Sequence, residues 1–288
     1  MRRRLIAVGA TLLAALCFVW SRLAAWKIPF SPLSADGHVG ADYAERRGIA
    51  GDELAGEVDD MAVLARPGFD PGGLHPEIRR FYEQTTDYEM VTSVRWHRGF
   101  RLGAALAAPV TSRIEQLNLP GPGGADFELE SRIVSLPPEA DPREGARLWI
   151  RMRSDRRGRH ADDAAVFVAA YARHERDGET YTNIAVPLPD GNLSTVLRPE
   201  LLPTDAGTGI VFTTDAPGDP GLYLVTPLGP FQLPMSQRFR VYPAAASEAP
   251  VPPETSWKPD VVATHEMWLC GAGFLTITYA IRRAENGS

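Results

Sequence analysis

From Phe127 to Ile281 the chain repeats one pattern, a short segment of alternating apolar and polar residues followed by residues that form turns. Three of the intervening runs are rich in Gly, Pro and Asp: Arg176-Asp177-Gly178, Pro189-Asp190-Gly191 and Pro217-Gly218-Asp219-Pro220-Gly221. Short strands at this spacing, joined by turn residues, predict an antiparallel sandwich or barrel. We expect the strands at 127–136, 146–153, 164–174, 180–188, 193–197, 209–213, 222–226, 238–242 and 274–281.

Two helical stripes and one further strand precede this run. Pro76 suits the first turn of a helix, and apolar residues then recur on one face as far as Thr85. From Tyr88 to Trp96 the alternation is that of a strand with one buried face. The second helical stripe consists of Leu102, Leu106, Val110, Ile114 and Leu117. The predicted fold class is therefore α+β, mainly antiparallel β, with two packed helices.

The first 26 residues indicate a membrane anchor. Three arginines follow Met1, and Leu5 to Trp20 then contains no charge. An uncleaved helix from Leu5 to about Trp26 reaches the ~20 residues that a span needs, with Arg22 extending to the interface. The basic start predicts a single pass with a cytoplasmic amino terminus and the remaining chain outside. Cleavage as an export signal is the alternative.

Beyond the anchor, composition divides the chain in two. Residues 27–73 are acidic and rich in Gly and Pro, which predicts a tether, and residues 74–288 form the predicted β-rich domain. The apolar run from Met267 to Ile281 allows a second membrane span, but its alternation near the end favours a strand.

The net charge and the cysteine content exclude some classes of function and some kinds of metal site. The formal net charge is −6, so a nucleic-acid partner is not expected, because such proteins carry a basic surface. Of the 30 basic residues only Lys27 and Lys258 are lysines, and this bias toward arginine is typical of a bacterial genome of high GC content. The only cysteines are Cys17 and Cys270, which excludes a four-cysteine zinc site.

Arginines gather between residues 147 and 159. Alternation places three of them on one face of a strand and three at the tip of the following hairpin: Arg147, Arg151 and Arg153, then Arg156, Arg157 and Arg159. Guanidinium groups in such a cluster can bind phosphates, including lipid head groups. The alternative is a solvated outer face whose charge is balanced by neighbouring strands, and we favour it.

A ligand site for an apolar molecule is the second candidate. A helix laid across the mouth of a curved sheet can enclose a cavity, and the stripe beginning at Leu102 is suited to that place. The predicted lining is Leu102, Leu106, Val110 and Ile114 with Trp96 and Phe100. The alternative, which apolar stripes more often represent, is that these residues simply fill a core.

Catalytic chemistry has weak support. Asp162, Asp163 and His174 carry suitable groups, but no serine, cysteine, phosphate-loop or metal-ligand motif accompanies them. We therefore expect no metal and no cofactor. An extracytoplasmic, hydrolase-like enzyme is kept as the alternative to a binding protein.

Three segments resemble uncharacterised membrane-anchored proteins of actinobacteria: residues 74–83 (LHPEIRRFYE), 116–120 (QLNLP) and 183–189 (NIAVPLP). The resemblance covers most of residues 74–288 and implies a single-anchor envelope protein, with no functional residue to carry over. Together with the patterns above it predicts an envelope protein that binds a lipid, another apolar ligand or a partner protein.

Overall fold

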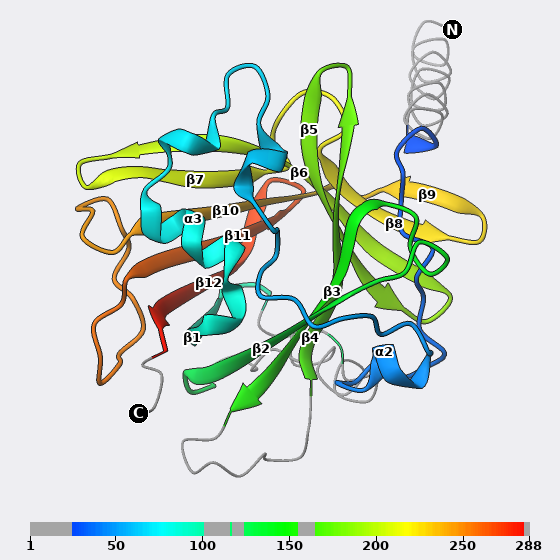
Figure 1. The fold of residues 1–288 in the computed structure, drawn as a ribbon, viewed down its shortest axis with the longest axis horizontal. Coiled ribbons are helices and arrows are strands. Elements are labelled where there is room, and N and C mark those ends of the chain that lie inside the picture. Colours follow the sequence, from blue (N-terminus) through cyan, green and yellow to red (C-terminus); the bar gives the residue numbers. More distant parts are fainter. Residues whose placement is uncertain (1–24, 101–115, 117–123, 155–164, 285–288) are drawn as a thin grey trace, which may run out of the picture.

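The computed structural model describes residues 25–100, 116, 124–154 and 165–284 of the 288, and within them the chain forms one antiparallel sheet of twelve strands (Figure 1). The strands are β1 (Tyr88–Trp96), β2 (Phe127–Ser135), β3 (Glu144–Ser154), β4 (Ala165–Arg176), β5 (Glu179–Leu188), β6 (Gly191–Thr204), β7 (Gly207–Thr213), β8 (Gly221–Thr226), β9 (Gly229–Gln232), β10 (Met235–Pro243), β11 (Val261–Leu269) and β12 (Ala272–Arg283).

The sheet closes into a barrel. Its order is β5-β4-β3-β2-β1-β12-β11-β10-β7-β6, and an additional pairing of β5 with β6 joins the two ends, so ten of the twelve strands form the wall. The long strand β6 makes this possible. Its first half pairs with β5 and its second half, from Arg198 to Thr204, pairs with β7. The hairpin β8–β9 is attached to the outer edge of the first half.

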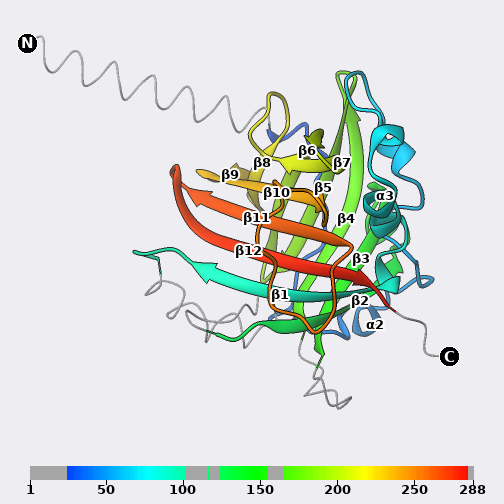
Figure 2. The same cartoon turned by 90° about the vertical axis from the view of Figure 1, so that its left-hand side faces the viewer.

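One end of the barrel is covered by short helices (Figure 2). They are η1 (Met61–Leu64), η2 (Pro71–Gly73), α3 (Pro76–Glu83) and η3 (Thr85–Asp87). Helix α3 begins at Pro76, as the sequence predicts, and its buried residues Ile78, Phe81 and Tyr82 join the same apolar cluster as the inward-facing strand residues. This cluster is the main core, and it extends from α3 into the interior of the barrel.

Residues 27–73, whose composition predicts a tether, lie against the barrel over much of their length. Leu33, Val39 and Tyr43 pack on the outer face of β3, β4 and β5 as a second apolar cluster, and the short helix α2 (Tyr43–Arg46) belongs to this layer. The apolar residues are spaced irregularly among Gly, Pro and acids, so no periodicity reveals that they are buried. The wall strands β3 to β5 are consequently covered on both faces.

A buried ion pair fastens this outer layer. The side chains of Asp141 and Arg143 are 0% and 1% exposed, and Arg143 Nη2 lies 2.7 Å from Asp141 Oδ2. Arg143 also donates to the Asn183 carbonyl at 2.8 Å, and Ser31 donates its hydroxyl to Asp141 at 2.7 Å. A buried pair is tolerated when its remaining hydrogen-bonding groups are satisfied in this way.

Gln116 fills a gap in the wall between β4 and β5. Pro187 has no N–H for the ladder, and the Gln116 side chain replaces the missing bonds by donating Nε2 to the carbonyls of Val168, at 2.8 Å, and Pro187, at 3.2 Å. The Val168 N–H donates to Gln116 Oε1 at 3.0 Å. The side-chain amide thus takes the place of a peptide group.

The mainly antiparallel fold and the helix at Pro76 are confirmed, and the run from Met267 to Ile281 belongs to strands β11 and β12. Except for Gln116, the predicted helix at 102–117 lies outside the described residues, and so does nearly all of the predicted anchor. Within residues 25–100, 116, 124–154 and 165–284, no helix combines the length and apolar character needed to cross a membrane.

Candidate ligand-binding cavity

The barrel interior contains two adjoining cavities of about 280 and about 70 Å³. The smaller lies beneath α3, against Phe81 and Tyr82, and the larger extends toward Trp96 and Phe274. Five residues line both: Arg151, Tyr171, Ile184, Phe239 and Tyr279. The larger cavity is otherwise lined mainly by apolar and aromatic side chains, among them Phe127, Leu129, Phe167, Val186, Met235, Met267 and Leu275.

Alternation along β3 directs arginines into this interior. Trp149 belongs to the interior cluster, whereas Leu148 and Ile150 belong to the outer one. Arg147 and Arg151 share the face of Trp149, so neither lies on the solvated outer face that we favoured from the sequence. The reason is the layer formed by residues 27–49, which covers the other face of β3 with apolar side chains.

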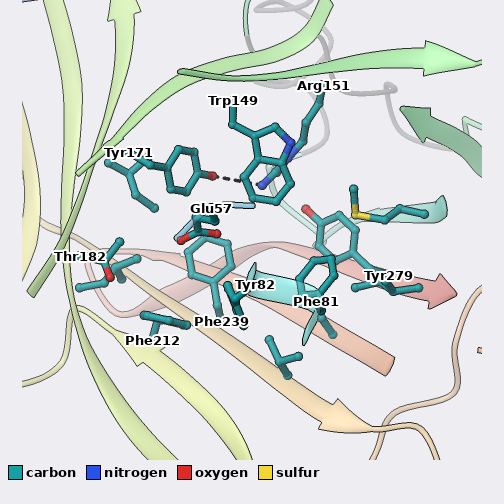
Figure 3. A pocket seen from close by; sticks show the side chains of 16 residues that line it. Glu57, Phe81, Tyr82, Trp149, Arg151, Tyr171, Thr182, Phe212, Phe239 and Tyr279 are labelled. Atoms are coloured by element: carbon teal, nitrogen blue, oxygen red, sulfur yellow. Dashed lines mark hydrogen bonds between the residues drawn. The ribbon is translucent and has the colours of Figure 1, made fainter. Parts of the chain in front are cut away.

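Arg151 is held among aromatic rings at the junction of the two cavities (Figure 3). Its guanidinium carbon lies 3.8 Å from the ring centroid of Trp149 and 5.3 Å from that of Phe167, distances at which a cation is attracted to an aromatic face. Its Nη2 donates a hydrogen bond to the Tyr171 hydroxyl at 3.1 Å. Because two aromatic side chains and a hydroxyl fix it, Arg151 presents a positioned positive charge to the cavity.

Glu57 lines the smaller cavity together with Arg151, and Gly56 allows the chain to place it in this position. A Cβ at Gly56 would lie 2.4 Å from the carbonyl carbon of Glu83, so only glycine allows this segment to pass so close to α3. Burial raises the pKa of Glu57 to about 7, and this outweighs the lowering effect of Arg151 and Arg147. Near neutral pH the side chain is therefore only partly ionised.

The two other strand arginines have different surroundings. Arg147 is buried, donates to the Gly56 carbonyl at 2.9 Å and pairs with Asp59 at 3.2 Å, so it anchors the segment that carries Glu57. Arg153 is exposed, with its guanidinium carbon 4.7 Å from the ring centroid of Phe127. Arg156, Arg157 and Arg159 lie outside the described residues. The three described arginines therefore do not converge on one patch.

His265 adds a neutral polar group to the larger cavity. Its ring stacks on Phe239 with centroids 3.7 Å apart, and its Nε2 lies 3.0 Å from Gln237 Oε1. Burial, together with the nearby charge of Arg151, lowers the pKa of His265 to about 3. The imidazole is consequently uncharged at physiological pH and serves as a hydrogen-bonding group.

Comparison with known proteins gives one informative match. The chain resembles a bacterial membrane protein. It is 32% identical, over 231 residues, to the uncharacterized membrane protein YndJ of Bacillus subtilis (strain 168), a match that includes 79% of this chain and 38% of the relative. The chain therefore spans well under half the length of that relative. No family model matches the chain, and no solved structure matches it. This match supports the resemblance to uncharacterised membrane proteins that was seen in the sequence. The relative comes from a Bacillus, so the match does not support the actinobacterial part of that resemblance.

Only two of the six predicted ligand-binding residues are among the described residues. Trp96 lines the larger cavity. Phe100 packs on Phe274, which lines the same cavity, and the two ring centroids are 5.8 Å apart. Leu102, Leu106, Val110 and Ile114 lie outside the described residues. Four further lining residues are not among those predicted from the sequence: Tyr171, Phe239, His265 and Tyr279. Tyr171, Phe239 and Tyr279 lie in predicted strands, whereas His265 lies in β11, and only barrel closure shows that their faces share one interior.

The residues considered for catalysis are not brought to this cavity. His174 is buried but lines neither cavity. Its Nε2 lies 3.1 Å from Asp219 Oδ2, and Arg176 pairs with the same carboxylate. Asp162 and Asp163 lie outside the described residues. Across the described ranges, no three or more His, Cys, Asp or Glu side chains are grouped so that they could hold a metal ion.

Proposed function

We propose that this protein is a membrane-anchored binding module of the bacterial envelope that holds an apolar small molecule inside its barrel. The observation that carries the proposal is the interior cavity of about 280 Å³ with its largely apolar lining. Ligand sites in proteins are typically concave, mainly apolar and equipped with a few placed polar groups, and this cavity has such groups in Arg151, Gln237 and His265.

The membrane part of the proposal depends on the amino-terminal sequence and on the relative. Residues 5–26 have the composition of a single span, and the matched relative is named a membrane protein. Where the described chain begins, Ala25 and Ile28 pack against Tyr181, Val196 and Tyr223, beside the attachment of β8. An anchor ending here would hold the barrel directly at the bilayer, with the amino terminus in the cytoplasm and the barrel outside.

A cavity-filling variant tests the binding function. Val186 lines the larger cavity, and Val186→Trp adds an indole to that space. In the full-length chain reconstituted in phosphatidylcholine nanodiscs, the neutral probe N-phenyl-1-naphthylamine should gain fluorescence over empty discs, and the variant should lose most of this gain. The matched control is Val211→Trp, because Val211 lies on β7 between the inward-facing Ile210 and Phe212 and so points outward.

Probe binding by the two variants decides whether the cavity is the binding site. Loss of probe binding in Val186→Trp, with binding retained in Val211→Trp, supports the cavity as the site. Equal binding by both variants, or no gain in the wild type, would contradict the proposal.

A further inference from the structure

Among the described residues that line the larger cavity, Arg151 alone carries a permanent charge. The other polar side-chain groups there are hydroxyls, the Trp96 indole N–H, the Gln237 amide and the His265 imidazole. Arg151 also lines the smaller cavity, so its guanidinium lies where the two adjoin. A ligand that fills the interior therefore lies against this cation.

The described protein compensates this charge only in part. The one hydrogen bond of the guanidinium goes to a neutral hydroxyl, that of Tyr171, and Arg151 Nε is buried with no hydrogen-bond partner among the described residues. None of the ion pairs between described residues includes Arg151, and Glu57, which lines the smaller cavity with it, is only partly ionised near neutral pH. A cation removed from water is costly unless a counter-ion pairs with it.

We propose that Arg151 binds the carboxylate of a single-chain amphiphile, of the fatty-acid class, whose apolar chain occupies the larger cavity. This inference rests on the proposed function. Trp149 and Phe167 flank the guanidinium, so its edge is left for a ligand. That edge carries paired N–H groups whose spacing matches the two oxygens of a carboxylate. Tyr171 accepts its bond from Arg151, and its own hydroxyl proton is left to donate to one of those oxygens.

The size and chemistry of the cavity favour one chain. Its volume of about 280 Å³ lies just below the ~300–1,000 Å³ usual for ligand pockets, which suits one acyl chain better than the two chains of a phospholipid. Met235 and Met267 lie in its wall, and methionine adapts to flexible apolar ligands. The interior therefore offers a charged group, the Arg151 guanidinium, where the two cavities adjoin, and an apolar space beside it for the chain.

The test compares a charged and an uncharged probe that share one chain. The full-length protein in phosphatidylcholine nanodiscs is titrated with cis-parinaric acid and with its methyl ester, and binding is followed by energy transfer from the protein tryptophans, with empty discs subtracted. The variants are Arg151→Gln and the matched control Arg153→Gln, which removes an exposed arginine two residues along the same strand.

We expect the wild type to bind the acid about tenfold or more tightly than the ester, because hydrogen bonds to charged groups contribute ~1.5–3 kcal/mol and ~1.4 kcal/mol is a factor of ten. Arg151→Gln should abolish this preference and leave ester binding within about twofold, and Arg153→Gln should change neither. Tyr171→Phe should remove part of the preference, and it keeps the test open if the circular dichroism of Arg151→Gln shows that this variant does not fold.

The outcomes separate the two proposals. Equal binding of acid and ester by the wild type overturns the carboxylate inference and leaves the binding function standing, whereas no binding of either probe overturns both. Equal losses in Arg151→Gln and Arg153→Gln overturn the inference in favour of general charge attraction. Stronger displacement of parinaric acid by a single-chain phosphate lipid than by oleate overturns it in favour of a phosphate head group.

Discussion

Replacing Glu57 with glutamine tests whether the barrel interior penalises a negative charge. Burial raises the pKa of this carboxyl from 4.5 to about 7 despite two nearby arginines. The difference of about 2.5 pKa units, at ~1.4 kcal/mol per unit, corresponds to about 3 kcal/mol between the two protonation states of the folded protein.

The direction of the pH dependence follows from this raised value. Because folded Glu57 holds its proton more tightly than the unfolded chain does, its stabilising contribution is complete below pH ~4.5 and is lost as the pH rises to about 7. Glutamine is neutral at every pH. Glu57→Gln should therefore match the wild type near pH 4.5 and exceed its free energy of unfolding by up to about 3 kcal/mol at pH 8.

Thermal unfolding of the full-length chain between pH 4.5 and 8.5 measures the effect. A domain of this size gains ~2–4 °C in Tm per kcal/mol, so the variant should melt about 6–12 °C above the wild type at pH 8. Glu139→Gln is the control, because Glu139 is exposed. If the Tm curves of Glu57→Gln and the wild type run parallel from pH 5 to 8, Glu57 is ionised in the folded barrel and the reasoning is wrong.

Two further predictions concern the outer layer and the anchor. Arg143→Ala leaves Asp141 buried without its partner and should destabilise the domain by ~3–5 kcal/mol in urea unfolding, while an unchanged midpoint would show that the pair contributes little. Ala7→Arg combined with Leu13→Arg should move the protein out of the membrane fraction or block its export, because each central charge costs ~2.5–3.5 kcal/mol on insertion scales; unchanged fractionation refutes the anchor.

Local chemistry made much of the strand pattern predictable. Asp177 and Gly178 adopt φ values of 54° and 78°, and Asp190 adopts 61°, so the turn residues seen in the sequence sit where the backbone needs the left-handed region. Strand β11 was missed, since its first four residues, from Val261 to Thr264, are all buried and the alternation that marks a half-exposed strand is absent.

The candidate site was only partly predictable, because it depends on which sheet face becomes the inside. Alternation correctly separates Arg151 from Ile150, but it does not say which face meets solvent. The answer is set by residues 33–43, more than 100 positions earlier, which cover the face of Ile150. Closure itself joins β5 to β6 by a local turn but β1 to β12 across the length of the domain, and short-range patterns carry no information about that pairing.

The pairing of β1 with β12 also sets the order of events during synthesis. Tyr88 is opposite Arg283, a separation of 283 − 88 = 195 residues, and β12 is the last of the described strands to be made. At ~5–20 residues per second this interval lasts about 10–40 s, during which the wall has an unpaired edge at β1 and its apolar inner face is open to water. Loss of β12 would leave an open sheet with free edges at β1 and β11 instead of a smaller barrel. The nascent chain is therefore prone to aggregation at this open edge until β12, the last described strand, pairs with β1.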